Sequence, residues 1–268
     1  MQEKCINLIT AHKTKDAVII HPSECISCSF TYLNNRDPVF PHGKVEVYYG
    51  SNENFISDIE KLADKLSIAE KNRAGKFISD IDRNTYIVCH GFLRIILSLK
   101  IGRNPSEIEI LADENNKPFL RGNPLYFNIS HDRNVFAIVV SEFTPVGVDI
   151  EKIKQDLDYS SLLNSVFTKR EICCVRGNPV VSTKNFFLLW TRKEALLKAI
   201  GTGIIDDLDK IDVSGMANEV SKVDHNNLYI KVPGSVFKDY YIYSLCVSDF
   251  YISVALPQQE TINIINLE

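Results

Sequence analysis

Two acidic side chains, Asp149 and Glu151, stand one residue apart in the apolar segment VGVDIEKI, residues 146–153. The segment is predicted to be a strand, so both carboxylates point to one face, about 6–7 Å apart along the backbone. Like charges this close repel, and acids are depleted in strands. An edge strand with one solvated face is the ordinary explanation, but the segment directly follows another apolar strand. A hard cation such as Mg²⁺, which takes oxygen ligands, would resolve the repulsion. These two carboxylates with a third from elsewhere in the chain would suit that ion.

Another acid and a base, Glu194 and Lys198, lie four residues apart in the segment KNFFLLWTRKEALLKAIG, residues 184–201. The apolar pattern predicts a helix that ends at Gly201, and the spacing places both side chains on one helix face. By themselves they are interpreted as a surface ion pair worth about 0.3–0.5 kcal/mol. Taken together with the strand carboxylates and a hard cation, Lys198 is a plausible phosphate contact.

Ser130 and His131 stand at the end of a third motif, LYFNIS, residues 125–130, which is predicted to be a half-buried strand. Polar side chains at a strand end are plausible contacts for a phosphate. A single histidine such as His131 is more often a structural residue, so the alternative stays open.

The elements that must position these residues are predicted from apolar periodicity. We expect a strand at 44–50, one helix across 53–77, a second helix at 82–99 and a hairpin of two strands, 135–142 and 146–153. After the helix at 184–200, the segments at 209–213, 228–234, 240–248 and 251–257 indicate an antiparallel meander.

Composition narrows the class of protein. The chain has 268 residues, 45% hydrophobic and 24% charged, with a net charge of −4. This charge gives no reason to expect nucleic acid or an anionic membrane as a partner. The start of the chain lacks the features of a signal peptide, and no apolar stretch approaches the roughly 20 residues that span a bilayer. Seven cysteines, two of them adjacent at 173–174, favour a reducing cytoplasm.

Three segments resemble, in order and spacing, the motifs of 4′-phosphopantetheinyl transferases: FNISHD (127–132), VGVDIEKI (146–153) and FFLLWTRKEALLKAIGTGI (186–204). The resemblance is greatest to the long, monomeric, surfactin-synthetase-activating type, and it runs from about Val45 to near the C-terminus. It implies an α/β (α+β) fold of two pseudo-symmetric halves. Each half would be a small, mostly antiparallel sheet packed with helices, with the ligand site at their interface. The expected boundaries are an extension of uncertain role at 1–43, an N-terminal half at 44–143 and a C-terminal half at 144–268.

The resemblance also implies roles for individual residues. Asp149, Glu151 and Glu194 would hold Mg²⁺ with the pyrophosphate of coenzyme A, and Glu194 and Lys198 would be catalytic. The coenzyme contacts would be Arg83, Ser130, His131, Lys193 and Lys198. Arg83 is the first choice for the adenosine 3′-phosphate, ahead of Lys71, Arg73 and Lys76.

The implied reaction moves the 4′-phosphopantetheine arm of coenzyme A to a serine of an apo acyl or peptidyl carrier protein and releases 3′,5′-ADP. Two alternatives remain open. One is a relative that binds coenzyme A or a carrier protein without transfer. The other is a Mg²⁺-dependent nucleotide pyrophosphohydrolase, which also gathers acids around a cation.

Overall fold

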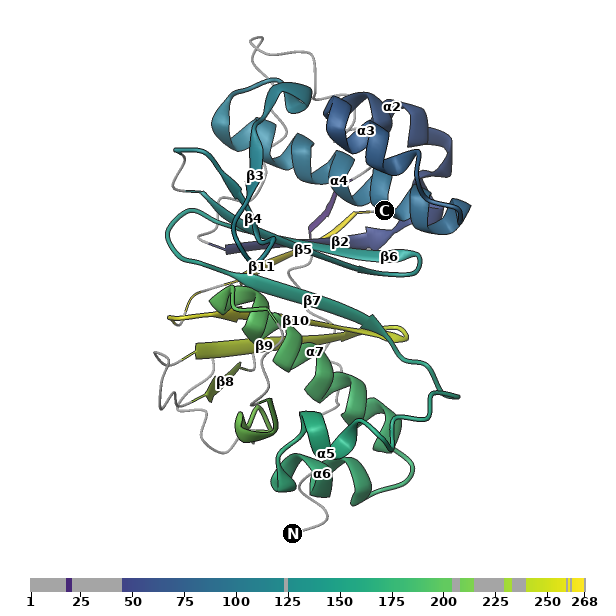
Figure 1. The fold of residues 1–268 in the computed structure, drawn as a ribbon, viewed down its shortest axis with the longest axis vertical. Helices are drawn as coiled ribbons and strands as arrows, with labels where there is room; N and C mark the ends of the chain where they lie inside the picture. Colours follow the sequence, from purple (N-terminus) through teal and green to yellow (C-terminus); the bar gives the residue numbers. More distant parts are fainter. Residues whose placement is uncertain are drawn as a thin grey trace. The chain divides into compact units, whose positions relative to one another are not determined.

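The computed structural model describes residues 18–20, 45–122, 125–203, 208–214, 229–232, 240–258, 260 and 262–267, with the backbone alone for 18–20 and 229–232. Of the predicted extension at 1–43, only 18–20 falls within these ranges. The chain forms two compact units. One unit holds the described residues before Thr144 together with 262–267, and the other holds those from Thr144 to Thr261. Figure 1 labels the helices and strands of both units.

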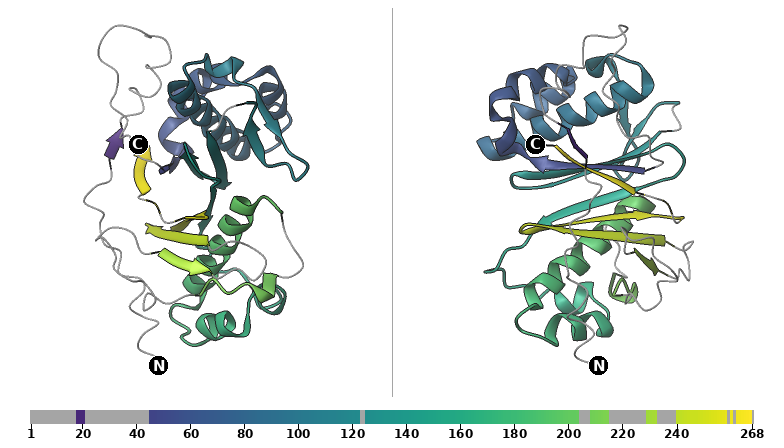
Figure 2. Two further views of the ribbon diagram at one scale, coloured as in Figure 1. Left: turned by 90° about the vertical axis from the view of Figure 1, so that its left-hand side faces the viewer. Right: turned by 180° about the vertical axis from the view of Figure 1, so that it is seen from behind.

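The first unit is built on a five-stranded sheet in the order β1-β11-β2-β6-β5. β11 runs parallel to both of its neighbours, whereas the pairs β2–β6 and β6–β5 are antiparallel. The last strand of the chain therefore lies inside the sheet of the first unit (Figure 2). The strands are β1 (Val18–Ile20), β2 (Val45–Ser51), β5 (Tyr126–Asp132), β6 (Val135–Ser141) and β11 (Ile262–Leu267).

Helices cover one face of this sheet. They are η2 (Asn52–Asp58), α2 (Ile59–Lys65), α3 (Ile68–Ala74), α4 (Asp80–Ile101) and the short η3 (Pro105–Glu107), followed by the hairpin β3 (Ile110–Ala112) and β4 (Pro118–Leu120). The second predicted helix is confirmed as α4, which ends where Gly102 adopts φ +67°.

The single helix predicted across 53–77 is wrong, because the chain breaks it into three pieces. Leu66 is extended, with φ −71° and ψ 148°. A capping box then starts α3: the Ser67 amide donates to the Glu70 carboxylate at 2.9 Å, and the Glu70 amide donates to the Ser67 hydroxyl at 3.3 Å. These bonds satisfy the backbone donors at the start of a new helix. The apolar residues keep helical spacing on both sides of the break, so periodicity alone did not reveal it.

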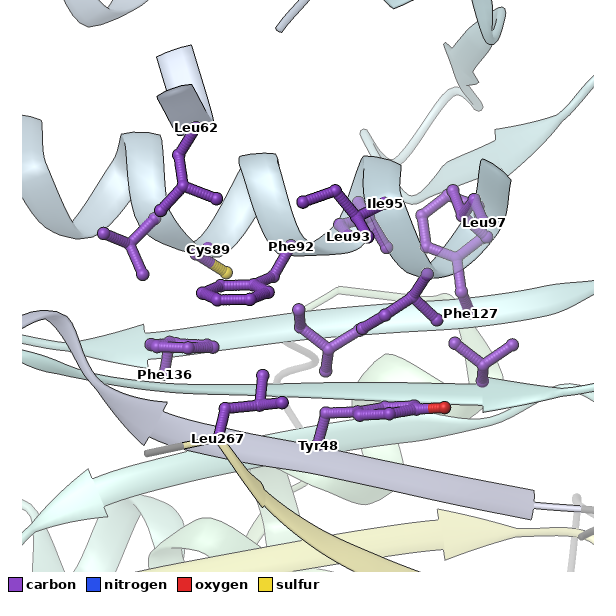
Figure 3. Close-up of a cluster of buried hydrophobic side chains, with 14 of the residues drawn as sticks. Tyr48, Leu62, Cys89, Phe92, Leu93, Ile95, Leu97, Phe127, Phe136 and Leu267 are labelled. Atoms are coloured by element: carbon purple, nitrogen blue, oxygen red, sulfur yellow. The ribbon is translucent and has the colours of Figure 1, made fainter. Parts of the chain in front are cut away.

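α4 forms the core of the first unit with the sheet (Figure 3). Phe92 of α4 stacks over Phe136 of β6, with ring centroids 5.9 Å apart, and Phe55 meets Phe92 edge to face at 4.7 Å. Leu267 of β11 is part of the same buried cluster. β11 is therefore held in the first unit by core packing as well as by strand pairing.

The second unit contains an antiparallel sheet in the order β7-β10-β9-β8, with α7 packed on it. The strands are β7 (Gly147–Lys152), β8 (Tyr229–Val232), β9 (Tyr240–Val247) and β10 (Phe250–Leu256). The helices are α5 (Leu163–Val166), α6 (Lys169–Arg176), α7 (Ser182–Ile200) and η4 (Leu208–Lys210). α7 matches its prediction, including the end at Gly201 with φ +84°.

Two predictions for strands are wrong. β6 and β7 do not form a hairpin: β6 pairs with β2 and β5, whereas β7 pairs with β10 in the other sheet. The strand expected at 209–213 is a 3₁₀ turn followed by irregular backbone. The meander itself is confirmed for β8, β9 and β10.

The mixed α/β class, with small and mainly antiparallel sheets packed with helices, is confirmed. None of the helices within the described ranges has the length and apolar character needed to cross a membrane.

Candidate functional site

β7 carries Asp149 and Glu151 on one face, as the alternation of the strand predicted. Val148 and Ile150, which point to the opposite face, are 0% and 1% exposed. Asp149 is itself only 4% exposed, and Glu151 is half-buried. In the register of the sheet, Asp149 lies opposite Ser253 of β10. The two acids therefore sit in an otherwise buried sheet, where a charge is costly without a partner.

α7 lies on the face of β7 that carries these acids. The ammonium of Lys198 donates to Oδ1 of Asp149 at 2.7 Å, and the Lys198 side chain is 29% exposed. The predicted surface ion pair between Glu194 and Lys198 is thus replaced by a pair between helix and strand. The structure brings three of the predicted residues together: Glu194 and Lys198 from α7 and Asp149 from β7.

One stripe of α7 remains partly open to solvent. Between Asn185 and Ala199, every residue is buried except Trp190, Glu194 and Lys198. These three are spaced four residues apart and so follow one another along a single helix face. The open stripe combines an acid, a base and an aromatic ring at the edge of the buried sheet.

The environment of Glu194 favours its protonated form. Burial raises the pKa of this carboxyl above its usual value, and the nearby charge of Asp149 raises it further, while Lys198 opposes both. In the described part of the chain, no side chain donates a hydrogen bond to Glu194. A carboxyl with a raised pKa next to a second acid is typical of a proton acceptor or of a cation ligand.

The carboxylates have the chemistry of a Mg²⁺ site, although their side chains are not gathered as one. Within the described ranges, no three His, Cys, Asp or Glu side chains lie close enough together to hold a metal ion. Asp149 binds the ammonium of Lys198, and Glu151 lies 3.6 Å from the ammonium of Lys154. A cationic group already neutralises each strand acid, which is the role that a hard cation would take with oxygen ligands. Metal binding by Asp149, Glu151 and Glu194 stays a prediction.

Ser130 and His131 belong to β5 of the first unit. They are opposite Ala137 and Phe136 of β6, so as consecutive strand residues they point to opposite faces. Ser130 is 8% exposed and His131 is exposed. Their predicted phosphate contacts stay predictions, and the two side chains do not share one face.

Arg83 lies in the first turn of α4, where its guanidinium is 2.9 Å from the carboxylate of Asp80. Both side chains are well exposed, at 42% and 77%. An exposed pair of this kind contributes little to stability, so the guanidinium can exchange its partner for a phosphate at small cost. The contact of Arg83 with the coenzyme stays a prediction.

Lys193 has a different environment from the one expected of a coenzyme contact. Its side chain is 1% exposed, and its ammonium lies 2.9 Å from the carboxylate of Glu171, which is fully buried. It also donates to the carbonyl of Leu208 at 2.8 Å and to that of Ile211. An ammonium has three donors, and all three are used inside the unit. We therefore correct the assignment: Lys193 holds the segment after α7 and is not placed to bind coenzyme A.

Sequence reasoning did not find Glu171, the partner of Lys193. The only local signal is the spacing Thr168-x-x-Glu171, which predicts the capping box that starts α6. Glu171 also accepts from the amide of Val213 at 2.8 Å. No spacing along the chain indicates a contact 42 residues away, so only the structure reveals it.

Comparisons with known proteins agree with the order of the motifs. A family model described as the 4′-phosphopantetheinyl transferase superfamily matches residues 145–254, and one described as 4′-phosphopantetheinyl transferase, N-terminal, matches residues 54–144. The 4′-phosphopantetheinyl transferase HetI of Nostoc sp. is 33% identical over 172 residues, which cover 62% of this chain and 72% of that protein.

Two further relatives match comparable shares. The L-aminoadipate-semialdehyde dehydrogenase-phosphopantetheinyl transferase of Schizosaccharomyces pombe is 29% identical over 229 residues, 76% of this chain and 88% of that protein. A 4′-phosphopantetheinyl transferase of Bacillus subtilis is 25% identical over 156 residues, 58% and 68% of the two chains. With the three motifs present in one chain and both family models matched in order, the chain belongs to the 4′-phosphopantetheinyl transferase superfamily and is a transferase enzyme.

Proposed function

We propose that the chain transfers the 4′-phosphopantetheine arm of coenzyme A to a serine of an apo acyl or peptidyl carrier protein. The observation that supports this most directly is the cluster of Asp149, Glu194 and Lys198 on β7 and α7. It places a base with a raised pKa next to an acid and an ammonium, in a member of this family. These are groups suited to a phosphoryl-type transfer, in which positioning and charge stabilisation do most of the work.

In the proposed reaction, the serine hydroxyl oxygen of the carrier protein forms a bond to the β-phosphorus of coenzyme A. The bond from that phosphorus to the bridging oxygen breaks, and 3′,5′-ADP leaves with the electron pair. Glu194 accepts the hydroxyl proton as a carboxylate, since its raised pKa, caused first by burial and then by the charge of Asp149, makes it a stronger base than an ordinary glutamate. Lys198 donates to the pyrophosphate and stabilises the charge that develops on the leaving group.

The proposed metal ligands are Asp149, Glu151 and Glu194. When bound there, Mg²⁺ would supply positive charge to the pyrophosphate. Lys198 would then exchange its contact with Asp149 for one with a phosphate oxygen, since it is the more exposed member of the pair. Arg83, Ser130 and His131 remain proposed contacts of the coenzyme.

Mass spectrometry of apo carrier protein incubated with the enzyme, coenzyme A and Mg²⁺ tests this proposal. We expect the carrier protein to gain the mass of one phosphopantetheine arm, on the serine that accepts it. Free 4′-phosphopantetheine with unmodified carrier protein would instead identify a pyrophosphohydrolase. Tight binding of coenzyme A or carrier protein with no new mass would identify a binding protein without transfer.

The Lys198→Ala variant tests the proposed phosphate contact. We expect the KM for coenzyme A to rise by roughly 10- to 100-fold, the loss of a charge-assisted hydrogen bond of about 1.5–3 kcal/mol. Lys61→Ala is the matched control, because Lys61 also forms a 2.7 Å ion pair, with Asp58, on an exposed surface. Unchanged kinetics in Lys198→Ala would show that its pair with Asp149 is only structural.

A further inference from the structure

Gly147, two residues before Asp149, is a point of close approach between β7 and the backbone of α7. A Cβ atom at this position would overlap the carbonyl oxygen of Ala195 and the amide nitrogen of Ala199, and it would lie 2.8 Å from the carbonyl carbon of Lys198. All three are backbone atoms, so no side-chain rotation could make room. The helix backbone rests directly on the strand because Gly147 has no side chain.

The place of this contact matters, because Gly147 shares its strand face with Asp149 and Glu151. The helix segment that touches it, from Ala195 to Ala199, is flanked by Glu194 and contains Lys198. The height of α7 above the strand therefore sets the distance between Lys198 and Asp149, which is 2.7 Å.

A second contact fixes α7 about one turn earlier. The hydroxyls of Thr191 on α7 and Ser253 on β10 are 3.0 Å apart, and both residues are 0% exposed. Ser253 lies opposite Asp149 in the sheet and also 3.0 Å from the hydroxyl of Ser244 on β9. Two contacts along one side of a helix set both its height and its rotation. The rotation decides that the stripe of Trp190, Glu194 and Lys198 stays at the open edge.

We propose that Gly147 is a positioning residue for the reaction, a role that rests on the proposed function. Its missing side chain lets α7 approach β7 so closely that Lys198 and Glu194 lie beside Asp149, and the pair of Thr191 and Ser253 holds the helix in that rotation. A methyl group at Gly147 must push α7 away from the strand. A misplacement of about 1 Å in such a site can lower a rate by roughly 100-fold.

A double-mutant cycle tests the proposal. The variants are Gly147→Ala, Lys198→Ala and both together, assayed for arm transfer to the apo carrier protein per folded molecule. Gly91→Ala, alone and with Lys198→Ala, is the matched control, since a Cβ at Gly91 would also be crowded, at 3.0 Å from Cβ of Leu62 in the first unit. Trp190 is the sole tryptophan of the chain, so its emission and its quenching by acrylamide report on α7 without any assay of activity.

We expect Gly147→Ala to lower kcat by about 10- to 100-fold and to change the quenching of Trp190. The fold-change in kcat/KM for coenzyme A that Lys198→Ala causes should then be at least threefold smaller in the Gly147→Ala background than in the wild type, because Lys198 is already displaced. In the Gly91→Ala background its full effect should persist, with the quenching of Trp190 unchanged.

Three results would overturn the proposal: wild-type kcat in folded Gly147→Ala, an equal loss of kcat in Gly91→Ala, or a full effect of Lys198→Ala in the Gly147→Ala background. If Gly147→Ala does not fold, Thr191→Val leaves Gly147 intact and removes the contact with Ser253, together with the bond from the Thr191 hydroxyl to the carbonyl of Leu188 inside α7. A lowered kcat with altered Trp190 quenching in that variant supports the proposal, and wild-type values of both reject it. If the wild type itself transfers nothing, the proposed function fails, and Trp190 quenching alone decides whether Gly147 positions α7.

Discussion

Glu70 on α3 and Glu194 on α7 are both partly buried carboxylates on helices, yet their pKa values shift in opposite directions. Burial acts on both to raise the pKa. For Glu70, hydrogen bonds from His90 and Arg94 outweigh burial and lower the pKa to about 2. For Glu194, the charge of Asp149 adds to the effect of burial, and the pKa rises. The partners of a buried acid, more than its burial, decide the sign of its shift.

The two environments serve different purposes. Glu70 joins elements: it accepts from the Ser67 amide in the cap of α3 and from the guanidinium of Arg94 on α4, which also donates to the carbonyl of Pro105 at 2.6 Å. Glu194 accepts no hydrogen bond from a side chain in the described part of the chain, and it lies on the partly exposed stripe of α7. A buried acid whose hydrogen bonds are satisfied is a structural residue. One held beside a like charge is poised to take a proton or a cation.

Asp149→Asn should have the largest effect on the Glu194 side of this comparison. It removes one proposed metal ligand and the charge that adds to the effect of burial in raising the pKa of Glu194, so transfer should fall by about 100-fold or more. The measurement is initial rates of arm transfer with Mg²⁺ in excess. Lys198 is 29% exposed and can be hydrated, so the variant should still fold cooperatively. Near-normal turnover would remove Asp149 from the site.

Glu194→Gln should separate the two roles of this residue. If Glu194 acts mainly as a base, the rate should fall by roughly 10²- to 10⁴-fold at every Mg²⁺ concentration. We expect the ligand role to dominate: the Mg²⁺ concentration for half-maximal rate should rise, and saturating metal should restore much of kcat. Titration of the rate with Mg²⁺ distinguishes the two. Wild-type rates throughout would exclude Glu194 from the chemistry.

Glu70→Gln should show the reverse profile, a loss of stability with the chemistry intact. It removes charge-assisted hydrogen bonds to Arg94 and His90, worth about 1.5–3 kcal/mol in the free energy of unfolding. Denaturant unfolding measures this loss, and kcat per folded molecule should stay within about twofold of the wild type. A kcat that falls with stability unchanged would contradict the comparison.

The smallest expected effect is the dependence of stability on pH, which should have opposite signs for the two acids. The lowered pKa of Glu70 makes its contribution full above about pH 4.5 and progressively lost as the pH falls toward about 2. The raised pKa of Glu194 means that its charge opposes folding at neutral pH. Glu194→Gln should therefore have a slightly larger free energy of unfolding than the wild type at pH 7–8, by about 0.5 kcal/mol, and a correspondingly higher melting temperature.

As the pH falls through 4.5 and well below it, the wild-type Glu194 carboxyl becomes protonated in the unfolded as well as the folded chain, so that difference should shrink and then vanish. Thermal melts in EDTA across this range measure both effects, because EDTA prevents a bound cation from masking the charge. A Glu194→Gln protein that is less stable than the wild type at pH 7–8 would show that its carboxylate has a stabilising partner.

The sequence by itself determined the local features of the site. Alternation placed Asp149 and Glu151 on one strand face, and four-residue spacing placed Trp190, Glu194 and Lys198 on one helix stripe. The ends of α4 and α7 could also be predicted from the sequence, because Gly102 and Gly201 follow the last helical turns. These features depend on neighbours within a few residues, and periodicity and turn chemistry report such neighbours directly.

Only the tertiary structure decided which distant groups meet. The partner of Lys198 is Asp149, 49 residues away, and not its helix neighbour Glu194. Lys193 is a buried partner of Glu171, although the family resemblance implied a coenzyme contact. The strand at 262–267 crosses to the sheet of the first unit, between β1 and β2. Such pairings depend on which surfaces are buried against each other, and a local pattern contains no information about a partner dozens of residues away.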